Sequence, residues 1–381
     1  MARLKVDVET GLHRRGFILG NGLDSGANKL KRKSRQNIGH PTVDLRALAE
    51  YVEQFSSKTI VVLGDFVADV FEFGEISRVS REAPVLILRH RETQLVPGGG
   101  ANAVNNLADL GAKVLPVTVV GDDSNGKALI QYFRQKKLDT SRILRVKNWC
   151  TPTKTRFLAG WAHTVGQQVL RVDREPQAQL PVDARKKLSQ FLFSAIKTAD
   201  ALAISDYGFG VATPALAFEA SSKRKMPFPI SLDARHNLHA YSRSRITTAT
   251  PNEAELESQH HTAIGENLEE LVRAGHATFS TMKLNSLLVT RGRHGMALFE
   301  SGKLLTHIPV HGSDQSVDVT GAGDTVLATF TLALACGASP LESSHLANIA
   351  GSIVVMKRGT ATVTRAELLA AIHDEVAGVS A

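Results

Sequence analysis

Short apolar segments that alternate with segments of helical periodicity constrain the fold of this chain more than any other feature. An apolar run at residues 59–63 ends in Gly64-Asp65 and predicts a buried central strand. From residue 201 onward the alternation is regular. Such alternation predicts an α/β fold in which helices cover both faces of a mainly parallel sheet. The further strands are predicted at residues 85–88, 114–120, 201–205, 229–233, 246–249, 286–290 and 296–299.

Two stretches interrupt this alternation, residues 77–97 and 153–174. Both are strand-like and carry polar residues at alternate positions, which is typical of strands with one solvated face. We predict that they form a small antiparallel sheet that stands off the main one as a lid over a cleft. Helices are predicted at residues 43–55, directly after 98–102, at 348–355 and at 365–376.

The chain has 381 residues, of which 43% are hydrophobic and 22% charged, and this suits one large α/β domain or two small ones. Its net charge of +8 is unevenly distributed, because residues 1–40 hold nine basic and three acidic side chains and leave only +2 for the rest. We predict a basic, disordered tail over 1–40, a globular domain over 41–376 and a short tail over 377–381. The basic run at 29–35 could contact RNA or acidic lipid, but a solvated charge run is favoured, and we expect no nucleic-acid partner.

The two cysteines, Cys150 and Cys336, are too few for a disulfide framework and lack metal-ligand spacing. No apolar run approaches the roughly 18 residues that a membrane span needs, and no signal-peptide core is visible. We therefore expect a cytoplasmic protein without a membrane partner.

The most informative local pattern is Asp-Val-Thr-Gly-Ala-Gly-Asp-Thr at 318–325. Gly321 and Gly323 permit a tight turn with uncovered amide groups, and the apolar spacing that follows predicts a helix. Bare amides at a helix N-terminus favour an anion such as phosphate. Asp324 then has two interpretations. It caps the helix, or it takes a proton from a hydroxyl that attacks the phosphate.

Other motifs are weaker. Residues 121–128 match the P-loop spacing, but Ala128 stands where a Ser or Thr would hold Mg²⁺, so an acid-capped turn is favoured. The glycine-rich turn at 98–102 lacks the third glycine of the dinucleotide fingerprint. The histidines show no spacing that is typical of a zinc site.

Three separated motifs occur in an order and spacing that resemble the ribokinase/PfkB carbohydrate kinases over residues 58–375. They are Gly-Gly-Gly-Ala-Asn at 98–102, Thr-Pro-Asn-Glu-Ala-Glu at 250–255 and the pattern at 318–325. Within the family, the chain is most similar to the bacterial heptose 7-phosphate kinases of ADP-heptose synthesis, through Gly64-Asp65 and the segments 77–84, 205–207 and 359–362. The resemblance implies a ribokinase-like three-layer sandwich with a mainly parallel central sheet and a small β lid.

The resemblance also implies residue roles in an ATP-dependent sugar kinase. Asp324 would be the base that deprotonates the acceptor hydroxyl, and the amides of Gly321, Ala322 and Gly323 would form an anion hole. Asp69 aligns with the family's sugar-binding carboxylate at the end of the first strand, and a plain helix cap is its alternative. Substrate contacts are implied at Asp69, Gly99, Gly100, Asn102, Arg171 and Asp206.

For the nucleotide, the family motif implies that Asn252 and Glu255 organise Mg²⁺ and its waters near the triphosphate. The same pair, three residues apart, also fits a helix-capping pattern. Asp318, with the carbonyls of residues 357–359, resembles the family's monovalent-cation site, where K⁺ is expected. ATP contacts are implied at Asn252, Thr290, Gly292, Gly295 and Asn348.

Three functional hypotheses follow. The first is ATP-dependent phosphorylation of heptose 7-phosphate at O1, which gives the 1,7-bisphosphate. The second is a kinase for another sugar or a nucleoside, because Val70 and Phe209 stand where the heptose-kinase pattern has cations, although Arg235 keeps one charge. The third is a non-catalytic sugar- or nucleotide-binding regulator, against which the retained Asp324 argues, since a binder needs no base.

The resemblance further implies a homodimer, since lid strands in this family often pair between subunits. No nucleotidyltransferase domain follows residue 376, so we expect any later nucleotidyl step to need another protein.

Overall fold

The fold is that of a computed structural model, which describes residues 38–39, 43–160, 166–223, 228–312 and 315–379. The predicted basic tail lies outside these ranges except for residues 38–39, so its disorder stays a prediction, as do the domain limits at 41 and 376. Within the described ranges, every helix is too short or too polar to cross a lipid bilayer.

A ten-stranded sheet forms the centre of the fold, with the spatial order β1-β14-β13-β12-β11-β10-β9-β2-β5-β6. All neighbours from β6 to β12 are parallel, and β13 is antiparallel to both β12 and β14. The predicted α/β fold with a mainly parallel sheet is confirmed. The strands are β1 (Ile38–Gly39), β2 (Thr59–Gly64), β5 (Lys113–Gly121), β6 (Ile143–Val146), β9 (Ala201–Asp206), β10 (Ile230–Ala234), β11 (Thr248–Ala249), β12 (Ser286–Thr290), β13 (Met296–Glu300) and β14 (Leu305–Ile308).

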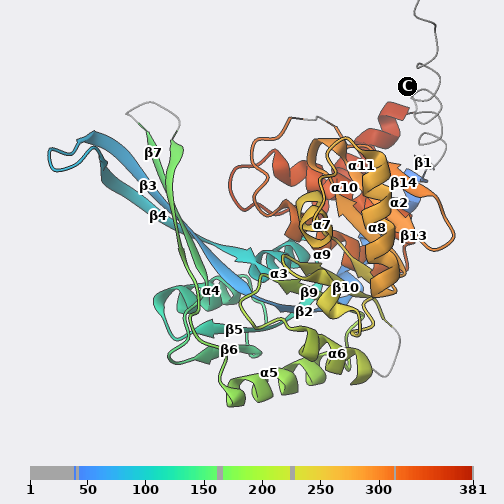
Figure 1. Ribbon diagram of the computed structural model, residues 1–381, viewed down its shortest axis with the longest axis horizontal. Coiled ribbons are helices and arrows are strands. Elements are labelled where there is room, and N and C mark those ends of the chain that lie inside the picture. Colours follow the sequence, from blue (N-terminus) through green and yellow to red (C-terminus); the bar gives the residue numbers. More distant parts are fainter. Residues whose placement is uncertain (1–37, 40–42, 161–165, 224–227, 313–314, 380–381) are drawn as a thin grey trace, which may run out of the picture. The chain divides into compact units, whose positions relative to one another are not determined.

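Helices cover both faces of this sheet because its inner strands are apolar on both sides. In β2, Val61 and Leu63 belong to one hydrophobic cluster, and Ile60 and Val62 belong to the other. Helices α5, α6 and α8 pack on the first cluster, and α2, α3, α4, α9, α10 and α11 pack on the second, which gives the expected three layers (Figure 1). The helices are α2 (Leu45–Gln54), η1 (Phe55–Ser57), α3 (Gly100–Asp109), α4 (Ser124–Gln135), α5 (Val182–Ala195), α6 (Pro214–Lys223), η2 (Leu238–Tyr241), α7 (Glu253–His260), α8 (Leu268–Met282), η3 (Gly292–His294), α9 (Ala322–Ala335), α10 (Pro340–Val355) and α11 (Arg365–Val379).

A second sheet of four strands, in the order β4-β3-β7-β8, forms the lid (Figure 1). The prediction of a purely antiparallel sheet was wrong, because the hairpins β3-β4 and β7-β8 are joined by parallel pairing of β3 with β7. The chain runs through two strands of the main sheet between these hairpins, and a crossover of that length permits parallel pairing. The lid strands are β3 (Phe66–Val79), β4 (Leu86–Gly99), β7 (Thr153–Gly160) and β8 (Gln167–Arg174).

Most predicted elements lie close to the observed ones. The strand predicted at 286–290 coincides with β12, whereas the one predicted at 246–249 is reduced to β11. The last helix continues beyond the predicted residue 376 to Val379. The P-loop-like stretch is an acid-capped turn, because Asp123 caps α4 and accepts a hydrogen bond from the Gly126 amide at 2.8 Å.

Candidate active site

The polar residues of the site gather at the carboxyl ends of β2, β9 and β10. Strand β2 has β5 on one side and β9 on the other, so the order in which the chain adds strands reverses here. Such a switch point leaves a crevice beyond the carboxyl ends of the strands in open α/β sheets. Asp65 follows β2, Asp206 ends β9, Asp233 lies in β10, and the N-terminus of α9 brings Asp324 to the same edge.

Asp324 is a buried carboxylate with two hydrogen-bond donors. Its residue surface is only 2% exposed. Its Oδ2 accepts a hydrogen bond from Asn102 Nδ2 at 3.1 Å, and its Oδ1 accepts one from the Tyr207 hydroxyl at 3.1 Å. Burial raises the pKa of Asp324 to about 7 against these two bonds, which act to lower it. A carboxylate with such a pKa is suited to take up and release a proton near neutral pH.

The turn in front of Asp324 leaves space beside its backbone, although the Ala322 amide of the predicted anion hole donates to the Val319 carbonyl at 3.3 Å. Gly321 has φ +81°, and a Cβ on it would lie 2.5 Å from Nδ2 of Asn102. The same Nδ2 donates to the Gly321 carbonyl at 3.2 Å, so α3 fixes the turn that opens α9. Gly323 is exposed, and the nearest neighbour of its Cβ position is Asp233 Oδ2 at 3.9 Å. The N-terminus of α9, which begins at Ala322, therefore has room for an anion.

Asp69 lies inside β3 of the lid and not at the end of the first strand, where it was predicted. This position also rules out the helix-cap alternative. Its Oδ1 accepts a hydrogen bond from Arg156 of β7 at 2.6 Å, and its Oδ2 accepts one from the Thr360 hydroxyl at 3.1 Å. Gly98 must lack a side chain, since a Cβ would lie 2.2 Å from the Asp69 Oδ2. The charge of Asp69 adds to the rise in the pKa of Asp324, so the two carboxylates interact.

Gly99 and Gly100 have a packing reason for lacking side chains. A Cβ on Gly99 would lie 2.9 Å from the carbonyl oxygen of Asp65, and one on Gly100 would lie 3.0 Å from the Cα of Gly64. Both glycines let the start of α3 pack closely against the end of β2. A sugar contact at these two positions stays a prediction, whereas Asn102 of the same turn contacts Asp324 directly.

A cavity of about 440 Å³ opens beside Asp324. Asn252 and Glu255 line it and also cap α7, because Asn252 Oδ1 accepts from the Glu255 amide at 2.8 Å and Glu255 Oε2 accepts from the Asn252 amide at 2.9 Å. The capping interpretation is confirmed, and the Mg²⁺ role stays a prediction beside it. Among the residues singled out from the sequence, the cavity is lined by Asp206, Asn252, Glu255, Thr290, Gly321, Gly323 and Asp324.

Carboxylates crowd this cavity. Burial, followed by the charges of Glu255 and Asp324, raises the pKa of Asp233 well above its usual range. Burial also raises the pKa of Glu255 and of Asp206. Mutually repelling oxygen donors suit a hard divalent cation, so this donor set fits Mg²⁺. Within the described ranges, no three His, Cys, Asp or Glu side chains converge closely enough to enclose a metal, and Mg²⁺ commonly completes its shell with water and phosphate oxygens.

The residues predicted to contact ATP fall into two groups. Thr290 lines the cavity with Asn252 and pairs with it through a parallel bridge. Gly295, which precedes β13, and Asn348 of α10 instead lie beside Pro309, the residue that follows β14. A Cβ on Gly295 would lie 2.8 Å from the carbonyl carbon of Pro309, and Asn348 Nδ2 donates to the Pro309 oxygen at 2.7 Å.

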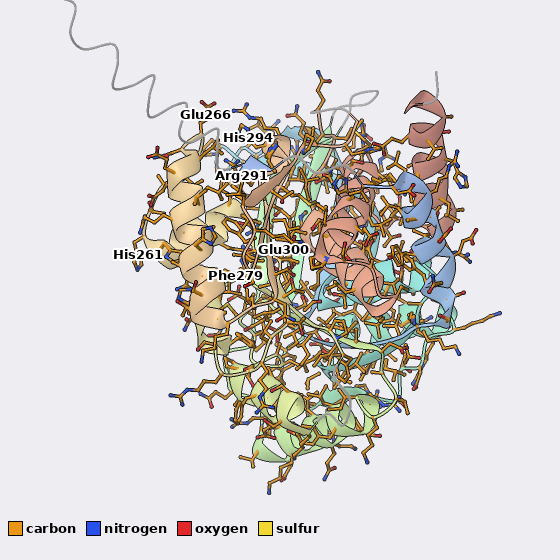
Figure 2. All side chains as sticks on the ribbon, turned by 90° about the vertical axis from the view of Figure 1, so that its right-hand side faces the viewer. His261, Glu266, Phe279, Arg291, His294 and Glu300 are labelled. Atoms are coloured by element: carbon orange, nitrogen blue, oxygen red, sulfur yellow. The ribbon has the colours of Figure 1, made fainter. Side chains whose placement is uncertain are left out.

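The turn between these two groups is anchored by Arg291. Its Nε donates to Glu253 at 2.6 Å, and its NH2 group donates to the carbonyl of Gly265 at 2.6 Å. Figure 2 shows Arg291 and His294 grouped with Glu266 near one end of α8. Gly292, with φ +52°, has no atom within 4 Å of its Cβ position, so a ligand can approach its backbone.

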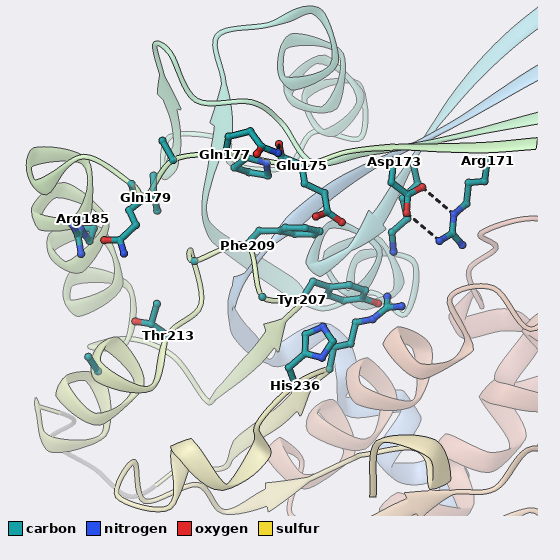
Figure 3. Close-up of a pocket in the computed structure, with 18 residues that line it drawn as sticks. Arg171, Asp173, Glu175, Gln177, Gln179, Arg185, Tyr207, Phe209, Thr213 and His236 are labelled. Atoms are coloured by element: carbon teal, nitrogen blue, oxygen red, sulfur yellow. Dashed lines mark hydrogen bonds and ion pairs between the residues drawn. The ribbon is translucent and has the colours of Figure 1, made fainter. Parts of the chain in front are cut away.

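Asp318 and Arg171 lie apart from the small cavity. Asp318 accepts hydrogen bonds from the amides of Thr320 and Gly359 at 2.9 Å each, and these bonds lower its pKa although burial acts to raise it. A monovalent cation at Asp318 stays a prediction. Arg171 pairs with Asp173 of β8 at 2.9 Å and lines a different cavity (Figure 3).

This larger cavity, of about 890 Å³, lies between β7, β8 and the segment after β9 (Figure 3). Tyr207 lines both cavities. Lys154 Nζ lies 5.3 Å from the centre of the Tyr207 ring, and Arg235 Cζ lies 6.0 Å from it. Neither cation forms an ion pair with a described residue. Burial and then the charge of Arg235 lower the pKa of Lys154, while the charges of Asp69 and Asp173 act to raise it.

Comparison with protein families matches residues 57–367 to the pfkB family carbohydrate kinases. The chain belongs to the pfkB family. The predicted family and the predicted enzyme class, a carbohydrate kinase, are thereby confirmed. The "Bifunctional protein HldE" of Pelobacter propionicus is 35% identical over 332 residues, which cover 87% of this chain and 66% of that protein. The protein of the same name from Caulobacter sp. strain K31 is 38% identical over 336 residues, 86% of this chain and 65% of its own length. The chain thus spans slightly less than two thirds of these relatives.

Solved structures of pfkB-like kinases share the fold. Phosphofructokinase-2 from Escherichia coli in complex with potassium superposes with a TM-score of 0.67 at 19% identity, over 83% of this chain and 98% of that one. Arabidopsis thaliana ribokinase complexed with ribose and ATP gives a TM-score of 0.64 at 21% identity with the same coverage. At these identities the comparison confirms the ribokinase-like fold.

Three residues that line the two cavities were not singled out from the sequence as site residues. Asp233 was included only as the last residue of the strand predicted at 229–233, and Tyr207 only as part of the segment 205–207. Lys154 gave no signal beyond strand alternation. All three interact with neighbours that are distant in sequence, as in the bond between Tyr207 and Asp324.

Proposed function

We propose that the chain transfers the γ-phosphoryl group of ATP to a hydroxyl of a phosphorylated sugar, first of all to O1 of heptose 7-phosphate, which gives the 1,7-bisphosphate. The observation that carries the proposal is the buried carboxylate of Asp324, whose pKa burial raises to about 7, at the N-terminus of α9. A helix cap alone has no need of such a pKa, whereas a general base does.

In the proposed reaction, Asp324 takes the proton of the acceptor hydroxyl while the hydroxyl oxygen bonds to the γ-phosphorus. The bond from that phosphorus to the bridging oxygen breaks, and ADP leaves with the bonding electron pair. Charge on the transferring group is spread over its oxygens, so the amides of Gly321 and Gly323, and that of Ala322 if it exchanges its bond to the Val319 carbonyl, would stabilise it. The proton on Asp324 is afterwards released to solvent.

Asn252 and Glu255 would hold Mg²⁺ through water, and the bound ion neutralises charge on the phosphates. Thr290, Gly292, Gly295 and Asn348 stay the proposed contacts of the nucleotide. K⁺ at Asp318 is part of the proposal on family grounds, as is a sugar contact at Asp69.

An anionic acceptor is supported by the larger cavity. Lys154 and Arg235 lie there without a close ion pair among the described residues, although Asp69 and Asp173 act on Lys154 and Arg235 acts on Asp233 and Glu255 through their charges, and a sugar phosphate would supply a direct partner. Phe209 lines the same cavity at a position where the heptose-kinase pattern has a cation. Lys154 and Arg235 supply positive charge in its place. The HldE names of the relatives agree with a heptose phosphate. The alternative acceptor, an unphosphorylated sugar or nucleoside, is favoured only by Val70 and Phe209.

A cytoplasmic homodimer is also part of the proposal. Large apolar side chains are exposed on the lid strands, among them Leu86, Leu170 and Val172, and a second copy of the chain would cover them. One solved neighbour is described as the tetrameric inhibited form of phosphofructokinase-2 from Escherichia coli.

The experiment is a kinase assay of the full chain with Mg²⁺ and ATP against phosphorylated and free sugars, with the product's phosphorylation site determined by NMR. We expect turnover with heptose 7-phosphate, and we expect Asp324→Asn to lower it about 10³-fold while ATP binding is retained. Asp139→Asn, in an exposed turn, is the control for an acidic residue outside the site. Undiminished turnover of Asp324→Asn would reject the proposed base. ATP binding without turnover on any sugar would favour the non-catalytic regulator.

A further inference from the structure

Tyr207 lines both cavities, as do Arg235 and His236, and has no part in the mechanism above. It directly follows β9, its hydroxyl donates to Asp324 Oδ1 at 3.1 Å, and the cationic groups of Lys154 and Arg235 lie 5.3 Å and 6.0 Å from the centre of its ring. Figure 3 shows the ring beside His236, with Phe209 on the neighbouring part of the same segment. One side chain thus contacts the proposed base and lines the proposed acceptor cavity.

Asp65 fixes the backbone of Tyr207 by accepting hydrogen bonds from the segment that follows β9. The Tyr207 amide donates to Asp65 Oδ2 at 2.9 Å, and the Phe209 amide donates to the same oxygen at 3.0 Å. The Val211 amide donates to Oδ1 at 2.9 Å. Asp65 is fully buried, so the three bonds fix the start of this segment on the end of β2. The phenol of Tyr207 therefore approaches Asp324 from a rigid base.

We infer that Tyr207 is a positioning residue for Asp324: its hydroxyl orients the carboxylate and stabilises the ionised form that accepts the proton. This inference rests on the proposed function. Asn102 holds Oδ2 from α3, and Tyr207 holds Oδ1 from the end of β9, so the two donors prevent rotation of the carboxylate. Each carboxylate oxygen accepts more than one hydrogen bond, which leaves capacity for the acceptor hydroxyl.

Other charged groups also face Asp324 from the surrounding elements. They are Asp69 of β3, Lys154 of β7 and Asp233 of β10. The negative charges disfavour the ionised carboxylate, and Lys154 favours it. A hydrogen bond that is donated to the charged form lowers a carboxyl pKa. Loss of the Tyr207 hydroxyl must therefore raise the pKa of Asp324. The ring that remains in Tyr207→Phe still lines both cavities.

The test is the pH dependence of kcat/KM for Tyr207→Phe with ATP and heptose 7-phosphate. We expect the acidic limb of the profile to move to higher pH by about one unit. At a pH on that limb, kcat/KM should fall about tenfold, whereas near pH 9 most of the activity should return and KM for ATP should stay unchanged. Tyr241→Phe is the matched control, because its hydroxyl donates to Asp206 at 2.6 Å, and its acidic limb should not move.

Two further measurements keep the outcomes separate. Replacing Tyr207 with 3-fluorotyrosine keeps the shape but strengthens the donor, so the limb should move to lower pH. Carboxyl-carbon NMR titration of the protein without acceptor, assigned with Asp324→Asn, should report the same rise of the Asp324 pKa in Tyr207→Phe. An unmoved limb and an unmoved titration would overturn the role of Tyr207. If the titration moves but no sugar is phosphorylated, the proposed function fails and the positioning contact stands.

Discussion

At the scale of single residues, Asp324 is a buried carboxyl group whose ionisation lowers the free energy of unfolding. Burial is the largest influence on its pKa, and donors on α3 and after β9 offset only part of it. The residue was predictable because Gly321, Gly323 and Asp324 are adjacent in sequence and form their turn locally. Its partner Asn102 lies 222 residues away, so its contact with Asp324 depends on the packing of α3 against α9.

Asp324→Asn should stabilise the protein at pH 8. The folded-state pKa of Asp324 is raised to about 7, while an unfolded Asp titrates near ~3.9. Between these values the folded state binds more protons than the unfolded state, so the free energy of unfolding falls as pH rises from about 4 to about 7. The Asn variant lacks this fall, so above pH 7 its free energy of unfolding should exceed that of the wild-type protein by at most about 4 kcal/mol.

Urea unfolding of both proteins at pH 4 and pH 8 measures this difference. The two should be close in stability at pH 4, where the carboxyl is protonated in the folded state and about half protonated in the unfolded state, and should diverge by pH 8. A wild-type protein that is the more stable of the two at pH 8 would contradict the raised pKa.

At the scale of elements, most strands of the main sheet were predictable as short apolar runs, but β1, β6 and β14 were not predicted, and the run predicted at 85–88 overlaps β4 of the lid. β3 was not predictable either, since only its first half is buried and its second half is partly exposed, so it has no single periodicity. The parallel contact of β3 with β7 gives no local signal, because residues 100–152 separate β4 from β7. For the same reason the pattern at Asp69 did not predict that Arg156 would be its partner.

Asp65→Ala should loosen the segment that follows β9. The substitution leaves the amides of Tyr207, Phe209 and Val211 without their acceptor, so we expect a loss of about 2–5 kcal/mol in the free energy of unfolding. Asp139→Ala, which removes an acceptor for the Ser141 amide in an exposed turn, should cost less than about 1 kcal/mol. Urea denaturation measures both, and hydrogen exchange should show faster exchange at residues 207–211 in Asp65→Ala only. Equal effects of the two substitutions would contradict the proposed anchor.

At the scale of the whole molecule, the lid and the main sheet contribute to one substrate path. Lys154 comes from β7 of the lid, Arg235 follows β10 of the main sheet, and both approach the ring of Tyr207. This arrangement was not predictable from either segment, since it requires the relative placement of two sheets. Recognition of an anionic acceptor would therefore depend on both the lid and the main sheet.

Lys154→Met and Arg235→Met should each raise KM for the phosphorylated acceptor about 10- to 100-fold, because a charge-assisted bond to phosphate contributes about 1.5–3 kcal/mol. KM for ATP should not change in Lys154→Met, since Lys154 lines only the larger cavity, whereas Arg235 also lines the small cavity beside Thr290, so that KM for ATP is diagnostic for Lys154→Met alone. Lys187→Met is the matched control, because Lys187 also lies over an aromatic ring, that of Phe191, but outside both cavities. Steady-state kinetics with a phosphorylated and a free sugar separate the two acceptor classes. An equal rise of KM for both sugars would mean that the two substitutions disturb the placement of the lid, and that the acceptor does not need a phosphate. A rise of KM confined to the phosphorylated sugar requires that its anion bind between the lid and the main sheet.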